Sequence, residues 1–170
     1  MQTLSDLVAL RSLLGDLGAG DEIGLMCAPE LRASIYDVAP TNCLTFAGTG
    51  GDGVHFGLLD LGHGVSDASP VVMTVPMNFD QPNLVVGANL RDFLSLGIRR
   101  GYFTLEQLTY DRPHWVKTLD RANYAKDLSA SGIRALKAIE KAFKVKPWTA
   151  HDARLRALQA EYGGRLLLRR

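Results

Sequence analysis

The chain has 170 residues, of which 46% are hydrophobic and 22% charged, and its formal net charge is +1. A chain of this length buries roughly two thirds of its unfolded surface, so it folds without a structural metal or disulfides. These values exclude disorder as the dominant state and predict one globular domain, with or without an appendage.

The charge is unevenly distributed along the chain. Residues 1–111 hold 5 Lys and Arg against 13 Asp and Glu, a balance of −8, whereas residues 112–170 hold 14 against 5, a balance of +9. An acidic first part and a basic second part indicate either mutual attraction or a basic surface for an acidic partner.

The N-terminus and the two cysteines bear on the compartment. The opening Met-Gln-Thr-Leu-Ser-Asp lacks the basic and apolar regions of a secretory signal. No apolar stretch approaches the ~20 residues of a membrane-spanning helix. We therefore expect a cytoplasmic protein without membrane contact. Cys27 and Cys43 form no Cys-x-x-Cys motif and are expected to be buried, reduced thiols, with a single disulfide left open.

Two helices are expected before the first strand. Thr3 followed by Asp6 matches a capping box, and leucines then recur at helical spacing at Leu7, Leu10, Leu14 and Leu17. Pro29 and Glu30 favour the start of a second, short helix over residues 29–38, with Leu31 and Ile35 on one face.

Four short strands follow without a helix between them. They are expected over residues 43–47, 54–59, 71–75 and 84–87, and the first two are joined by the glycine-rich turn 48–53. This spacing predicts an antiparallel meander. The expected fold class is α+β, with a central antiparallel sheet of about four to six strands flanked by helices.

Helices return after the strands. Asn89 is a good N-cap for a helix beginning at Leu90, and Thr104 with Gln107 forms another capping-box pattern. Further helices are expected near 113–126, 130–144 and 148–162. We divide the chain into an α+β domain, residues 1–110, and a basic helical C-terminal extension, residues 111–170, that packs on it through Trp115 and Trp148.

The glycine-rich run Gly48–Gly53 does not match a nucleotide-binding loop. A phosphate loop needs a Lys followed by Ser or Thr and then a helix, and a dinucleotide fingerprint also needs a helix. Here a strand is expected instead. The simpler interpretation is a tight turn with positive φ angles, which glycine adopts without steric cost.

Imidazole and carboxylate groups gather around this hairpin. Asp52 and His55 are separated by two residues, as are Asp60 and His63, and Asp67 follows. Such groups can bind a divalent metal, and Asp52, His55 and His63 would then serve a small metal-dependent hydrolase. The alternative is a solvated loop with one strand histidine. We assign no metal, cofactor or catalytic residue, and take Asp52, His55, Asp60 and Asp67 as candidate partner-binding residues.

Basic residues form two further candidates. Arg134, Lys137, Lys141 and Lys144 share one side of the helix expected over 130–144 and are suited to contacting nucleic-acid phosphates. The alternative is a solvated cationic face, or one docked on the acidic domain. Arg99 and Arg100 follow the helix that begins at Leu90, where they either stabilise its C-terminus or contact a partner.

In this order of elements, the chain resembles the SUKH superfamily, which includes fungal cell-wall-synthesis regulators and bacterial toxin-immunity proteins. The matching stretches are residues 28–31, 46–57, 70–73 and 85–94: a Gly/Asp-rich turn precedes a Phe-containing strand, and a later strand precedes a helix with a Phe-Leu pair. The resemblance covers roughly residues 1–108. It implies an α+β fold, no catalysis and binding to another protein, which in bacterial relatives is often a toxin.

Three functional hypotheses follow. The first is a SUKH-like protein-binding module, such as an immunity protein, whose acidic body complements a basic partner. The second is a nucleic-acid-associated protein, and the third is the metal-dependent hydrolase. A homo-oligomer is compatible with each of them.

Overall fold

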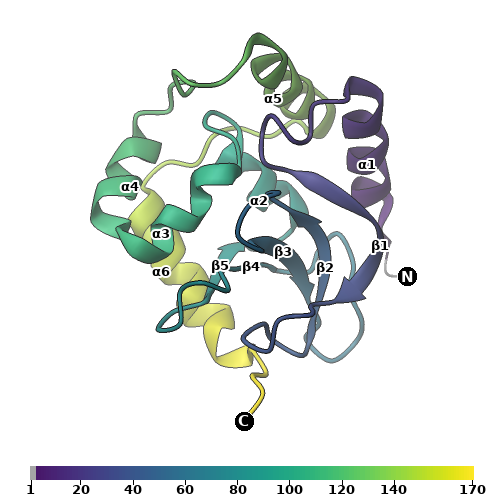
Figure 1. Ribbon diagram of the computed structural model, residues 1–170, viewed down its shortest axis with the longest axis vertical. Helices are drawn as coiled ribbons and strands as arrows, with labels where there is room; N and C mark the ends of the chain where they lie inside the picture. The colour runs from purple at the N-terminus through teal and green to yellow at the C-terminus, as the bar shows by residue number, and fades with distance from the viewer. Residues whose placement is uncertain (1–2) are drawn as a thin grey trace.

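The computed structural model describes residues 3–170, and it consists of one sheet with helices before and after it (Figure 1). None of its helices has the length and apolarity that crossing a membrane requires. Its elements are α1 (Ser5–Leu17), β1 (Met26–Ala33), β2 (Cys43–Gly48), β3 (His55–Leu59), β4 (Val71–Thr74), β5 (Asn83–Gly87), α2 (Leu90–Gly97), the 3-10 helix η1 (Phe103–Glu106), α3 (Gln107–Tyr110), α4 (Arg112–Asp120), α5 (Ala130–Phe143), α6 (His151–Tyr162) and the 3-10 helix η2 (Gly163–Arg165).

The sheet is a five-stranded antiparallel meander in the order β1-β2-β3-β4-β5. The predicted α+β class and antiparallel sheet are confirmed, and β2 to β5 correspond to the four predicted strands. Consecutive strands pair directly because each connection is a turn or loop, with no crossover helix.

The helix predicted over residues 29–38 is wrong. Residues 26–33 form β1, which pairs with β2 through Met26↔Gly48, Cys27↔Ala47 and Arg32↔Thr45. Pro29 is tolerated because β1 is an edge strand. The helical spacing of Leu31 and Ile35 was misleading, since Ile35 is 87% exposed in the structure.

Helix caps differ in how well the local sequence predicted them. Asn89 caps α2 as predicted and accepts a hydrogen bond from the N–H of Asp92 at 2.8 Å. The capping box at Thr3 is wrong: α1 is preceded by Leu4, without a cap from its own side chain. The pattern at Thr104 is wrong too, because this residue lies inside η1.

One face of the sheet packs on helices through an aromatic cluster. The ring of Phe93 in α2 lies 5.8 Å from that of Phe46 and 4.7 Å from that of Phe56. Tyr102 is fully buried against Phe93 and donates a hydrogen bond to the carbonyl of Leu94 at 2.7 Å. Burial of these large rings supplies much of the apolar contact between sheet and helices.

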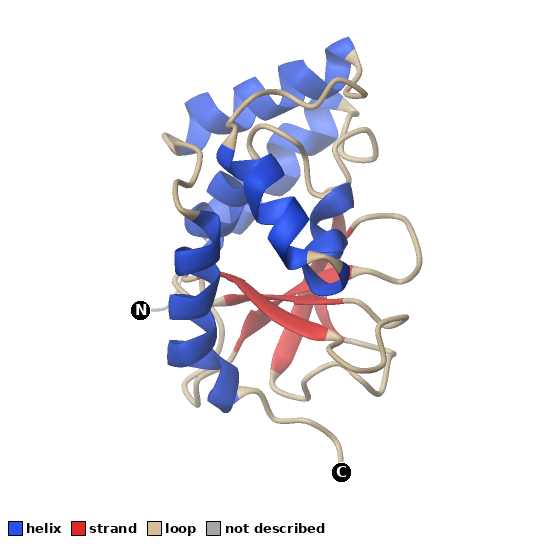
Figure 2. Ribbon diagram, turned by 90° about the vertical axis from the view of Figure 1, so that its left-hand side faces the viewer, coloured by secondary structure: helices blue, strands red, loops and turns tan. Residues whose placement is uncertain are grey.

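Residues 111–170 share this core. Leu136, Ile139, Phe143, Leu155 and Leu158 are buried in one cluster with the strands and α2. The Trp148 indole is buried and donates to the Asp92 carbonyl at 2.9 Å, whereas Trp115 is partly buried. Helix α6 runs beside the β5 end of the sheet (Figure 2), so β1 is the edge left for other contacts.

Candidate functional site

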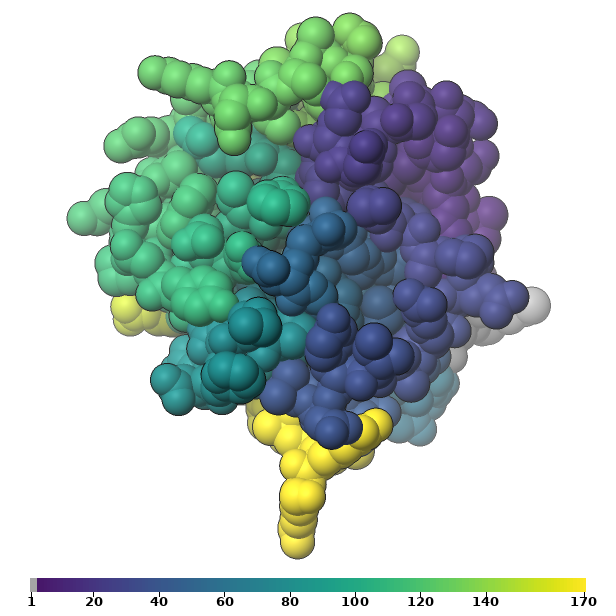
Figure 3. Space-filling view, in the orientation of Figure 1, coloured from purple at the N-terminus to yellow at the C-terminus, as the bar shows by residue number. Residues whose placement is uncertain are grey.

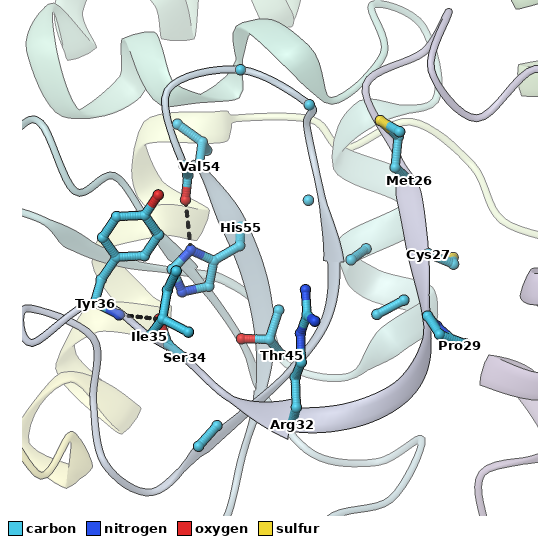
Figure 4. A pocket seen from close by; sticks show the side chains of 17 residues that line it. Met26, Cys27, Pro29, Arg32, Ser34, Ile35, Tyr36, Thr45, Val54 and His55 are labelled. Atoms are coloured by element: carbon cyan, nitrogen blue, oxygen red, sulfur yellow. Dashed lines mark hydrogen bonds between the residues drawn. The ribbon is translucent and has the colours of Figure 1, made fainter.

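An open groove lies between β1, residues 34–36 and the glycine-rich turn (Figure 4). Its volume is about 500 Å³, within the range of small-ligand pockets. The lining combines apolar side chains with polar groups, among them Arg32, Ser34, Tyr36, Thr45 and His55.

The groove exists because β1 bows away from β2. Pairing is regular at Cys27↔Ala47 and at Arg32↔Thr45, so five residue steps along β1 face only two along β2. Extra residues in one strand break the ladder and bend that strand outward. Figure 4 shows β1 as a wide arc around the hollow.

The turn that closes the groove is a tight connection between strands, as the glycine pattern predicted. Gly50 and Gly53 have φ angles of 86° and 71°, and Asp52 adopts 50°. A β-carbon on Gly53 would lie 2.2 Å from the hydroxyl oxygen of Tyr36. The positive φ angle therefore favours glycine at this position, and the Tyr36 side chain would have to shift to admit a β-carbon.

Three polar side chains lie on the same face of the sheet at this point. Arg32 is the cross-strand partner of Thr45, and Thr45 is the partner of Gly57, two residues after His55. Because cross-strand partners and alternate residues share a face, the three are neighbours. Figure 4 shows them around one hollow.

His55 is held as a neutral ring. Its Nδ1 lies 2.7 Å from the Gly53 carbonyl oxygen, which can only accept, so Nδ1 donates and Nε2 is left as an acceptor. Tyr36 stacks on the ring, with centroids 5.7 Å apart. Burial lowers the pKa of His55, and the nearby Arg32 guanidinium lowers it further.

The groove offers no activated nucleophile. Burial raises the pKa of the Cys27 thiol in its wall to about 11, so this group stays protonated at neutral pH. Thr45 and Ser34 have hydroxyls, but no general base among the described residues is hydrogen-bonded to either. The arrangement can therefore bind a polar group, and it lacks the nucleophile–base pair that covalent catalysis needs.

Asp60 and Asp67, two of the predicted partner-binding residues, hold the protein's own backbone. One carboxylate oxygen of Asp60 accepts from the N–H groups of Gly62, His63 and Gly64 at 2.8, 3.0 and 2.8 Å. These hydrogen bonds, led by that from Gly62, lower the pKa of Asp60. Asp67 caps the first turn of α1. Neither residue lines the groove.

The metal-site alternative is not assembled by the fold. His55 opens β3, whereas His63 lies beyond its other end in the loop stabilised by Asp60. Asp52 is exposed on the turn. Across residues 3–170, no group of three His, Cys, Asp or Glu side chains is placed to hold a metal ion.

Arg99 and Arg100 are engaged with the helical part of the chain. Arg99 makes a two-pronged ion pair with Glu140 of α5 at 2.8 and 3.0 Å and lies over the Tyr124 ring at 5.0 Å. Arg100 donates to the side-chain oxygen of Asn123 at 2.8 Å. Both arginines tie the end of α2 to residues 121–144, away from the groove.

The basic stripe is exposed on α5, as its helical spacing predicted. The opposite side of α5 buries Ala135, Leu136, Ile139 and Phe143. Glu140 lies among the basic residues and is neutralised by Arg99. The stripe itself consists of the exposed residues Arg134, Lys137, Lys141 and Lys144.

Exposed apolar side chains around the groove were missed from the sequence. Seven of the eleven exposed large hydrophobic residues among residues 3–170 belong to β1, the segments 34–36 and 76–82, and η1–α3. Figure 3 shows these segments adjoining on one face. We call these seven residues the apolar rim: Met26, Ile35, Tyr36, Met77, Phe79, Phe103 and Tyr110.

The rim residues form two neighbouring groups. The glycine-rich turn lies against Met26 and Phe103 in the first, and a hydrogen bond holds the 76–82 loop to α3 in the second. β-Carbons on Gly50 and Gly51 would lie 2.8 Å from the Met26 sulfur and 3.1 Å from the Phe103 ring. The Asn78 side chain donates to the Thr109 carbonyl at 3.1 Å, bringing the 76–82 loop to α3. Met77 and Phe79, between Pro76 and Asp80 in a turn, were the one local signal for this surface.

Comparison with known proteins gave no relatives. A scan against models of protein families, a search of curated proteins and a search of solved structures each found no match for this chain.

Proposed function

We propose that this chain is a non-catalytic protein-binding module of the SUKH type that docks a partner protein through the apolar rim. The observation that carries the proposal is the concentration of seven exposed apolar side chains, four of them aromatic, on adjoining segments of the face that holds the groove. Contiguous apolar surface is rare on monomeric proteins and marks interaction sites.

The composition of the rim supports a protein partner. Aromatic residues and Met are enriched at protein interfaces, and large anchors there carry most of the binding energy. Phe79 and Phe103 are 78% and 52% exposed, so each buries a large apolar area only when a partner covers it. The resemblance to the SUKH superfamily, a group of protein-binding domains, agrees with this role.

The charge of this face favours a basic partner. Asp80 and Glu106 lie on the rim segments, and Asp52 lies in the glycine-rich turn beside them. Burial raises the pKa of Glu106, and the Asp52 carboxylate raises it further. The effect of Asp52 shows that the two acidic groups lie close together on this face. A basic toxin would be attracted by complementary potential, and we place the encounter in the cytoplasm.

Photo-crosslinking tests the proposal directly. Benzoylphenylalanine replaces Phe79 or Phe103 in cells that express the protein, and the matched control replaces Val8, which is 60% exposed on α1. We expect one protein to be captured from the rim positions and not from position 8. Capture with equal yield at all three positions, or at none, would reject the rim as the docking surface.

The identity of the partner is tested in a second step. The captured protein is produced with and without this chain in the same host, beginning with products of neighbouring genes. Restored growth on co-expression would support an immunity role, and sedimentation of the pure protein tests whether the rim joins two copies instead.

The exposed cations of α5 keep nucleic-acid binding as the second candidate. Arg134, Lys137, Lys141 and Lys144 form no ion pairs with other residues in the described part of the chain. Lys137 also lies over the Tyr124 ring at 5.7 Å. Exposed cations in a row along a helix are suited to phosphate contacts.

A further inference from the structure

We infer that the groove binds the free carboxyl end of a polypeptide, with the carboxylate on Arg32 and Thr45 and the last amide N–H on His55. This inference rests on the proposed function, because the polypeptide is the chain end of the docked partner. It assigns a chemical class of ligand to a part of the face that the apolar rim alone does not explain.

Arg32 supplies the charge. The residue is exposed, and its guanidinium makes no ion pair or hydrogen bond with any other described residue, so it is free to bind an anion. It is close enough to lower the pKa of His55, so it stands beside the groove floor. The planar fork of guanidinium donors matches the two oxygens of a carboxylate.

Thr45 supplies a hydroxyl donor. The residue is only 9% exposed, and its hydroxyl has no hydrogen-bond partner within residues 3–170. The oxygen is not among the fully buried polar atoms that lack a partner, so the hydroxyl is open to the groove and free to donate to a ligand oxygen. Figure 4 shows this side chain at the wall of the hollow, beside Arg32.

His55 supplies the acceptor. With Nδ1 donating to Gly53, the neutral ring presents Nε2 to a donor. A carboxylate alone has no such donor, whereas the last residue of a polypeptide carries its amide N–H two bonds from the carboxyl carbon. The pairing of one cation, one hydroxyl and one acceptor therefore fits a chain end better than a simple anion.

The surroundings specify what precedes the carboxylate. The apolar rim borders the groove through Met26, Ile35, Tyr36 and Phe103, and acidic residues flank it at Asp52 and Glu106. Apolar side chains would therefore pack on the rim, and basic residues would be favoured further from the end by charge complementarity. Capture of a terminal carboxylate is a recurring mode of peptide recognition.

Fragment titration followed by NMR of the His55 ring tests the inference. The probe is N-acetyl-leucine, which carries a carboxylate, an amide N–H and an apolar side chain, and the comparison ligands are its C-terminal amide and acetate. We expect saturable shifts of the His55 signal with N-acetyl-leucine only. Equal shifts with the amide or with acetate would overturn the inference.

Variants assign the contacts. Arg32→Gln should lower the affinity for N-acetyl-leucine about tenfold or more, the scale of a charge-assisted hydrogen bond. Thr45→Val should lower this affinity about fivefold. Arg112→Gln, at the start of α4 and outside the groove, is the matched control and should bind as wild type. Unchanged binding by Arg32→Gln with a native amide spectrum would refute the assignment.

Failure here and failure of the proposed function are separable. Replacing Phe79, outside the groove, should abolish partner capture and leave the fragment titration unchanged. Loss of probe binding with retained partner capture would reject the carboxyl-end inference alone. If the partner is captured equally at rim and control positions while N-acetyl-leucine still binds, only the docking role of the rim would be rejected.

Discussion

The carboxylate of Asp67 accepts the N–H of Leu7 at 3.0 Å through one oxygen and the N–H of Asp6 at 2.8 Å through the other. It thereby satisfies two of the backbone donors that the first turn of a helix leaves free. The loop before β4 supplies the cap for α1, so the two segments are fixed to each other. The Asp67 backbone also joins this contact, donating to Thr3 and accepting from Leu90.

Asp67→Ala should therefore destabilise the whole domain. The expected loss is about 1–2 kcal/mol of unfolding free energy, the upper part of the range for removing a helix cap, because the helix is tied to the sheet through this residue. Urea denaturation measures it. Asp80→Ala, in an exposed turn, is the control and should change stability by less than about 0.5 kcal/mol. Equal effects of the two substitutions would contradict the capping role.

Gly53 should tolerate alanine worse than a glycine with free space around it. Both Gly53 and Gly18 have left-handed φ angles, 71° and 59°, but only Gly53 would place a β-carbon against Tyr36. Gly18→Ala should cost about 1 kcal/mol for the backbone alone. Gly53→Ala should cost more and disturb the Tyr36 and His55 signals in NMR spectra. A smaller cost at Gly53 than at Gly18 would argue against steric closure of the turn.

Local pattern correctly predicted the strands β2 to β5 and the helices α1, α2, α5 and α6. Asn89 at the start of α2 and the leucines of α1 act within one turn of their own element, so the sequence contains the whole signal. β1 was missed because Pro29 and Glu30 favour a helix start locally. Its strand conformation comes from pairing with β2, and Cys27 and Ala47 are 20 residues apart. Such tertiary pairing overrides local propensity.

The site was predicted only in part for the same reason. His55 was identified, but Arg32 was placed on a helix that does not form, so its position opposite Thr45 could not be foreseen. Asp60 and Asp67 were assigned to a partner because their backbone acceptor roles depend on loop geometry. The apolar rim collects side chains from four segments, and only the folded chain brings them to one face.

Acid should destabilise the protein through carboxylates that are paired in the folded state. The Arg99 guanidinium lowers the pKa of Glu140, and the Arg91 guanidinium lowers that of Asp6. A lowered folded pKa contributes stability that is complete above the unfolded values, 4.5 for Glu and 3.8 for Asp, and is lost as pH falls through the folded values. We expect the melting temperature to fall below about pH 4.5.

Glu140→Gln tests the contribution of one pair. The variant should be less stable than wild type at pH 7, and the difference should shrink as the pH falls toward 3, because wild-type Glu140 then becomes protonated too. Glu30→Gln, on exposed β1, is the matched control. A constant difference between Glu140→Gln and wild type from pH 7 to 3 would show that the ion pair carries no pH-dependent stability.

Phe79→Ser should separate binding from folding. Phe79 is 78% exposed, so its replacement should leave the unfolding free energy within about 0.5 kcal/mol of wild type. Partner affinity should fall at least about tenfold if the ring is an interface anchor. Val8→Ser on α1 is the control and should keep full affinity. Calorimetric titration with the captured partner provides the measurement, and an unchanged affinity for Phe79→Ser would exclude it as an anchor.

The basic stripe on α5 makes a separate prediction. If it contacts nucleic acid, binding should weaken steeply with salt, and Lys137→Glu with Lys141→Glu should remove most of the affinity and reduce the salt slope by about two. Fluorescence anisotropy with duplex and single-stranded oligonucleotides measures the affinity and the salt slope. The salt concentration is varied from about 50 to about 200 mM, a range over which phosphate contacts weaken strongly. Lys117→Glu with Lys126→Glu, which keeps the stripe intact and changes the net charge equally, is the control. Equal loss in both double variants would indicate attraction by net charge alone, and no binding at the lowest salt would eliminate this function.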